Sequence, residues 1–204
     1  MWPFYEIEVA GGDPIFMVFN IIGRGTLSQK ETSLRGMAYA SMFGALTAVG
    51  AYIMIPLPPV PITLQTLFVN LAGALLGGYL GALSQVVYIL LGVIGLPVFA
   101  GGKAGAGVLL GPTGGYLIGF VVGAFVIGKL TAIRKKPGLI WLICAMSLGI
   151  AVVYILGITQ LMIVAKLDFE KVIAVGLLPP LPGDILKVIV AALICRKVRD
   201  HIRL

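Results

Sequence analysis

The sequence predicts an all-α integral membrane protein with about six transmembrane helices. Of its 204 residues, 59% are hydrophobic and only 11% are charged, whereas a water-soluble domain is usually about one quarter charged. The mean hydropathy is +1.08, and the apolar stretches after residue 34 leave room for about six spans of roughly 20 residues each. Such a chain cannot cover a soluble surface, so we expect a multi-pass protein of the cell membrane.

Residues 1–33 differ from the rest of the chain. They carry charged residues around one apolar run, Ile15 to Ile22, that is too short to cross a bilayer. A signal peptide begins with basic residues, and this segment begins with acidic ones. We expect residues 1–33 to be an interfacial or disordered appendage, or to follow a start codon placed too far upstream. The transmembrane domain is then residues 34–204.

The first three spans are delimited by proline and glycine. The first runs from Leu34 to Ile55 and ends where IPLPPVP places four prolines in seven residues, because proline cannot continue a helix. We expect a rigid extended loop there. The second and third spans, residues 62–76 and 79–94, are joined by two glycines, which predicts a tight helical hairpin.

A glycine-rich segment follows the third span. Residues 95–115 hold eight glycines and two prolines, so we expect irregular backbone, yet the segment is too apolar for an ordinary solvent loop. Irregular backbone near a membrane persists only where it packs on protein or lines a cavity. The segment is therefore a candidate lid or binding surface, and the alternative is a simple connector.

The last three spans cover residues 116–133, 139–165 and 183–195. With the N-terminus inside, ten Lys and Arg residues flank the cytoplasmic ends, whereas the outer loops hold only Lys103, Lys166 and Lys171. This asymmetry favours an N-in, C-in topology. The basic residues sit at the ends of apolar segments, so the net charge of +7 indicates topology rather than binding to nucleic acid.

Asp184 and Lys187 are the charged pair that the sequence places inside a span. An ionisable group there is costly, which makes it a candidate functional residue, and the i, i+3 spacing puts both side chains on one helix face. The pair offers an anionic acceptor beside a cationic donor and suits a ligand with N–H and C=O or carboxylate groups. The alternative is a structural ion pair near a helix start.

Further candidates come from polar and aromatic side chains. Gln85 lies within the third span, where an unpaired amide is costly in hydrocarbon, and Lys103 lies in the glycine-rich loop. Tyr88, Phe99 and Tyr116 are candidates for the wall of an apolar pocket, or else for anchors at the membrane interface. An amide such as Gln85 inside a span either makes structural hydrogen bonds or contacts a ligand.

Small residues recur every fourth position along the first span, at Gly36, Ala40, Gly44 and Ala48. Such a stripe lets another helix approach closely in lipid. The other helix belongs either to a partner or to this protein itself.

The sequence lacks the motifs of an enzyme and of a protein that hydrolyses ATP by itself. His201 is the sole histidine and lies in the basic tail, so no Ser–His pair or histidine metal site is available. No GxxxxGK[ST] sequence occurs, so the chain has no P-loop of its own with which to energise transport. We expect no enzyme activity, no metal and no cofactor.

Three segments carry a resemblance to a known family. ALTAVGAYIMIPLPPVPITLQTLFVNLAGALLGGYLGALSQVVYILLGVIGLPVFAGG, LLGPTGGYLIGF and LLPPLPGDILK closely resemble the BioY family, the biotin-binding S components of energy-coupling factor (ECF) transporters. The resemblance runs from about Leu34 to the C-terminus.

The resemblance implies a six-helix S-component fold that captures biotin at the outer face. A transmembrane coupling protein and two cytoplasmic ATPases would supply the energy. The GDxxK motif that contacts biotin in the family matches Asp184 and Lys187, and the family's glycine-rich loop matches residues 101–115. The small-residue motif that docks the coupling protein matches Ala40 to Gly44, with Ala48 one turn further along the same stripe.

Two other functions compete with a biotin-binding subunit. A self-sufficient secondary carrier or facilitator for biotin or a similar acid would be favoured by inverted repeats, and no convincing internal repeat is visible. An intramembrane enzyme would be favoured by a nucleophile paired with a base, which the sequence does not offer.

Overall fold

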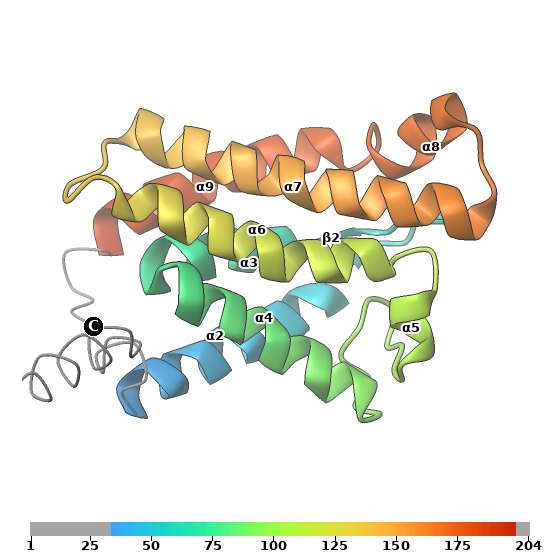
Figure 1. Cartoon of the computed structure of the whole chain (residues 1–204), viewed down its shortest axis with the longest axis horizontal. Coiled ribbons are helices and arrows are strands. Elements are labelled where there is room, and N and C mark those ends of the chain that lie inside the picture. The colour runs from blue at the N-terminus through green and yellow to red at the C-terminus, as the bar shows by residue number, and fades with distance from the viewer. Residues whose placement is uncertain (1–33, 199–204) are drawn as a thin grey trace, which may run out of the picture. The chain divides into compact units, whose positions relative to one another are not determined.

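The computed structural model describes residues 34–198, which form a bundle of helices (Figure 1). The expectation for residues 1–33 lies outside the described residues. The helices are α2 (Leu34–Tyr52), α3 (Gln65–Leu76), α4 (Gly78–Val93), α5 (Gly107–Leu110), α6 (Gly114–Ala132), α7 (Leu139–Ala165), α8 (Phe169–Gly176) and α9 (Leu181–Val198). Strands β1 (Met54–Ile55) and β2 (Ile62–Thr63) pair in an antiparallel hairpin.

Each apolar segment predicted from the sequence contains one helix. By length and composition, α6 and α7 qualify as membrane spans among the described residues. Helices α8 and α9, bent by 50° at their junction, qualify together as a third, while α3 and α4 are shorter apolar helices. The mostly helical architecture agrees with the predicted class, and the count of six spans and their orientation stay predictions.

The loops differ from the sequence predictions in detail. The four prolines form the tip of the β1–β2 hairpin, in which Met54 pairs with Thr63. The glycine-rich segment contains the short helix α5, and α6 already begins at Gly114. Helix α9 begins at Leu181, two residues earlier than predicted, because Pro182 lies in its first turn, where the missing N–H costs no hydrogen bond.

Helices α6 and α7 run side by side (Figure 1), and glycines allow close contact between them. A Cβ on Gly119 would lie 2.8 Å from the Cα of Val153, and one on Gly149 would lie 2.2 Å from the Ile127 side chain. Each distance is shorter than a normal contact, so only glycine allows the two helices to approach so closely. Close approach through small residues is the usual way that membrane helices pack.

The stripe of small residues on α2 faces the protein interior. Ala40 is 1% exposed, and a Cβ on Gly44 would lie 2.9 Å from the backbone oxygen of Ser84 in α4. The stripe therefore packs against this protein's own helix, which is the alternative left open by the sequence. Ala40, Gly44 and Ala48 are buried within this chain, and their role in docking a partner stays a prediction.

We expect Gly44→Leu to lower the melting temperature by several degrees. Overpacking a close contact costs about 1–3 kcal/mol, and each kcal/mol moves the midpoint by roughly 2–4 °C in a chain of this size. Thermal unfolding of the purified protein measures the change. The matched control is Ala45→Leu, because Ala45 follows Gly44 in the chain and is exposed. Equal melting temperatures of the two variants would contradict the observed packing.

Candidate functional site

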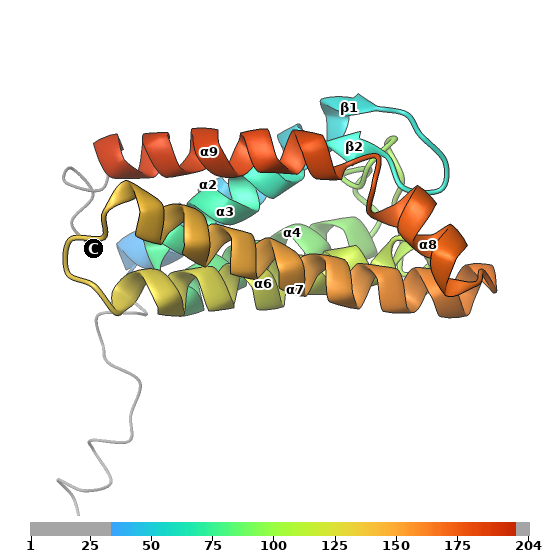
Figure 2. The same ribbon diagram turned by 90° about the horizontal axis from the view of Figure 1, so that it is seen from above.

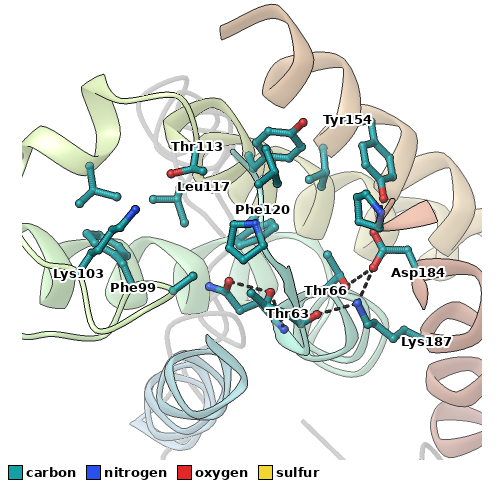
Figure 3. Close-up of a pocket in the computed structure, with 18 residues that line it drawn as sticks. Thr63, Thr66, Phe99, Lys103, Thr113, Leu117, Phe120, Tyr154, Asp184 and Lys187 are labelled. Atoms are coloured by element: carbon teal, nitrogen blue, oxygen red, sulfur yellow. Dashed lines mark hydrogen bonds and ion pairs between the residues drawn. The ribbon is translucent and has the colours of Figure 1, made fainter. Parts of the chain in front are cut away.

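A cavity of about 70 Å³ lies where the β1–β2 hairpin, α3, the glycine-rich loop, α6, α7 and α9 meet (Figure 3). Apolar side chains form most of its wall, among them Val60, Phe99, Leu117, Phe120 and Val153. Charged and hydroxyl groups gather at two places on this wall. A concave apolar site with a few convergent polar groups is the usual form of a small-molecule pocket.

Asp184 is the centre of the polar cluster. It lies in the first turn of α9 and is 5% exposed. Its Oδ1 accepts a hydrogen bond from Thr66 Oγ1 at 2.7 Å, and its Oδ2 accepts one from the Tyr154 hydroxyl at 2.5 Å. The carboxylate is thereby fixed by α3 and α7 as well as by its own helix.

Lys187 lies one turn further along α9 and completes the cluster. Its Nζ donates to Asp184 Oδ1 at 2.8 Å and to the backbone oxygen of Thr63 at 2.6 Å. The ammonium has three N–H donors, and these contacts use two of them. A third donor is left for a ligand, beside the remaining acceptor capacity of the Asp184 carboxylate.

The Asp184–Lys187 ion pair is largely removed from solvent. The side chains are 6% and 12% exposed, respectively. Desolvating two charges is expensive, and their attraction offsets that cost only when further hydrogen bonds satisfy both groups. Thr66, Tyr154 and Thr63 supply those bonds, so the structure agrees with a structural role for the pair as well as with a ligand-binding one.

Aromatic rings form one part of the apolar wall. Phe99 lies on Gly92, where a Cβ would come within 2.1 Å of the ring, and meets Tyr88 edge to face with centroids 5.6 Å apart. Tyr116 donates to the backbone oxygen of Gly176 at 2.9 Å. These contacts hold the rings in fixed orientations around the cavity.

Lys103 lies at the opposite end of the cavity from Asp184 and Lys187 (Figure 3). It is exposed and sits in the glycine-rich loop, where its backbone oxygen accepts a bond from the Phe99 N–H at 3.1 Å. Gly101 and Gly102 between them have φ of 75° and 69°, which favours glycine and makes the tight turn. The cavity therefore has a cation at each end and a carboxylate at only one.

The structure brings together five of the seven ligand-binding candidates predicted from the sequence. Asp184, Lys187, Lys103, Phe99 and Tyr116 all line the cavity. The other two lie behind the wall, as described next.

Tyr88 and Gln85 make contacts within the protein. The Tyr88 hydroxyl accepts a bond from Gln65 Nε2 at 2.6 Å, and Gln65 itself lines the cavity. Gln85 is fully buried and donates to Thr47 and Ser84. Its Oε1 has no hydrogen-bond partner among the described residues, and contact of Gln85 with a ligand stays a prediction.

Tyr154 is a lining residue that the sequence analysis missed. It is the one tyrosine of the long apolar helix α7, and a buried tyrosine hydroxyl usually has a hydrogen-bond partner. The lone tyrosine in an apolar helix was therefore a visible signal in the sequence. Local spacing did not, however, identify Asp184 as the partner of its hydroxyl. Thr63 and Thr66 also line the cavity. Within residues 34–198 no group of three His, Cys, Asp or Glu is placed to hold a metal ion.

Comparison with known proteins gives a consistent result. A family model described as BioY family matches residues 26–204. A biotin transporter BioY of Thermotoga maritima is 46% identical over 166 residues, covering 81% of this chain and 96% of that protein. One of Rhizobium etli is 41% identical over 176 residues, covering 81% and 94%. A crystal structure of the S-component for biotin from an ECF-type ABC transporter superposes with a TM-score of 0.76 at 29% identity, covering 86% of this chain and 95% of that one.

Proposed function

Because this chain belongs to the BioY family, whose named members are transporters and not enzymes, we propose that it is the biotin-binding membrane subunit of an ECF-type importer. It captures biotin at the outer face of the cell membrane. The observation that carries this proposal is the Asp184–Lys187 pair, which makes one end of an otherwise apolar cavity polar.

The chemistry of biotin fits this cavity. Its ureido ring has two N–H donors and one carbonyl, its bicycle is apolar, and its valerate tail is anionic. We place the ureido group against Asp184 and Lys187, because the carboxylate accepts N–H groups and the ammonium donates to the carbonyl. The anionic tail is repelled by Asp184, and Lys103 at the opposite end attracts it. Phe99 and Tyr116 would then contact the bicycle.

Energy for uptake comes from partner proteins in this proposal. The sequence has no P-loop, and the S-component that it resembles belongs to an ECF-type ABC transporter. We propose that a transmembrane coupling protein and two cytoplasmic ATPases act with this chain. The N-in, C-in topology with six spans places the glycine-rich loop and the β1–β2 hairpin at the outer side, where biotin arrives.

The purified chain alone is expected to bind about one biotin per monomer, because all residues of the proposed site lie in one chain. Isothermal titration in detergent, with unfolding monitored in parallel, measures the binding. A well-folded sample that gives no heat and retains no biotin would refute the proposal. Equal binding of riboflavin or thiamine would show a different vitamin specificity.

A further inference from the structure

One wall of the ligand cavity is formed by a segment that packs weakly on the rest of the protein. It comprises residues 105–113, which contain the short helix α5, and we call it the α5 segment. Val108 and Thr113 line the cavity, but no residue of α5 is buried and Leu110 is 78% exposed. Because little apolar surface is buried here, the position of the segment depends on its hydrogen bonds to neighbouring elements.

Gln160 of α7 makes two of these hydrogen bonds. Its Nε2 donates to the backbone oxygen of Leu109 at 2.6 Å and to that of Gly111 at 2.8 Å. The amide nitrogen of a glutamine carries two hydrogens, and these two bonds use both. The last carbonyls of a helix have no partner within the helix, so Gln160 caps α5 from a neighbouring element. It lies near the end of α7 that leads to α8 (Figure 2).

Two glycines at the start of α6 allow Gln160 to reach α5. A Cβ on Gly114 would lie 1.8 Å from the backbone oxygen of Leu109 and 2.6 Å from Gln160 Nε2. A Cβ on Gly115 would lie 2.8 Å from Gln160 Cβ. Any larger residue at these two positions would push the α5 segment and α7 apart. Gln160 itself does not line the ligand cavity, so its influence on a ligand passes through the segment that it holds.

The other end of the α5 segment is attached to α4. The Gly105 N–H donates to the backbone oxygen of Gly92 at 2.8 Å. Among the described residues, the remaining backbone hydrogen bonds of the segment are local turns within it or bonds to the adjacent start of α6. Without the two N–H donors of Gln160, the segment therefore loses its hydrogen-bonded attachment to α7.

We infer that Gln160 is a positioning residue for the ligand: its amide holds the α5 segment against the cavity and thereby slows the release of bound biotin. The inference deepens the proposed function and rests on it for the identity of the ligand. A loosened segment withdraws Val108 from the cavity wall and opens a route out. The hydrogen bonds of Asp184 and Lys187 do not involve this segment, so the polar end of the cavity stays intact.

Release of radiolabelled biotin from the purified full chain, chased with excess unlabelled biotin, tests the inference. Gln160→Met keeps the length of the side chain but has no N–H donor. We expect it to release biotin about tenfold faster, because two hydrogen bonds are lost, with association rate and ligand-free melting temperature near the wild-type values. Thr159→Val is the matched control, because Thr159 is exposed and its hydroxyl donates within α7 to the backbone oxygen of Ile155.

Two further measurements distinguish positioning from a general structural role. Amide hydrogen exchange of ligand-free Gln160→Met is expected to rise in the α5 segment and to stay unchanged in α9. In a Val108→Ala background, Gln160→Met is expected to accelerate release less than it does in the wild type, because Gln160 acts through the wall that Val108 forms. Gln160→Glu, which has the same shape and lacks the N–H donors, is a second variant and is expected to release biotin as fast as Gln160→Met.

Wild-type release rates in both Gln160 variants would overturn the inference and leave the proposed function in place. A wild type that binds no biotin would overturn both. Equal acceleration by Thr159→Val would also overturn the inference, because a general loosening of α7 would then be the cause. So would an unchanged effect of Gln160→Met in the Val108→Ala background, since the two residues would then act independently.

Discussion

Asp184→Asn and Lys187→Ala are each expected to weaken biotin binding by more than tenfold. A hydrogen bond to a charged group contributes on the order of 1.5–3 kcal/mol, and about 1.4 kcal/mol is a tenfold change in affinity. Asp184 also joins Thr66, Tyr154 and Lys187 through hydrogen bonds. Each single variant is therefore expected to melt at a lower temperature too, because removing one member of a buried ion pair costs roughly 3–5 kcal/mol.

The double variant Asp184→Asn/Lys187→Met separates ligand binding from stability. It leaves no uncompensated charge, so we expect its melting temperature without ligand to return towards the wild-type value while its biotin affinity stays low. Isothermal titration and thermal unfolding of the same samples measure both quantities. A double variant that melts normally and binds biotin with full affinity would show that the pair is purely structural.

Gly92→Ala is expected to weaken biotin binding by about tenfold or more. A Cβ at this position would lie 2.1 Å from Cζ of Phe99, whose ring lines the cavity and is 1% exposed. The ring has to leave its place on α4, and it is also packed edge to face on Tyr88. Overpacking of this kind costs about 1–3 kcal/mol of stability, so a lower melting temperature accompanies the loss of affinity.

Gly107→Ala is the matched control for this glycine. A Cβ on Gly107 meets nothing within 4 Å, so this variant should bind and melt like the wild type. Adding Phe99→Leu to Gly92→Ala relieves the clash, so the double variant should melt at a higher temperature than Gly92→Ala alone. Its biotin affinity should stay below that of the wild type, because the ring is missing. If Gly92→Ala behaves like Gly107→Ala in titration and unfolding, Phe99 is not held against α4 as described.

Much of the helical architecture was predictable because its signals are local. The long apolar stretches between proline and glycine breaks contain helices near the predicted bounds, and the Gly77 and Gly78 hairpin joins α3 to α4 as expected. Asp184 and Lys187 were predictable as a pair, because an i, i+3 spacing fixes the side chains on one face. Such features need no knowledge of the rest of the chain.

The orientation of uniformly apolar helices was harder to predict. On a helix that is hydrophobic on every side, no periodicity indicates which face is buried. The stripe around Gly44 therefore fitted a partner or an internal contact equally well, and its contact with α4 was not predictable from the spacing. Thr66 is 118 residues away from Asp184 in the chain, so no local pattern connects them.

The position of Asp184 at the start of α9 has a consequence for the biosynthesis of the protein. Thr63, Thr66 and Tyr154 are synthesised before α9, but the carboxylate and ammonium that bind them belong to this last described helix. During translation the polar end of the cavity is therefore completed only when α9 has inserted. A nascent or truncated chain that stops before residue 181 lacks the proposed site, so biotin is expected to stabilise finished molecules and not unfinished ones.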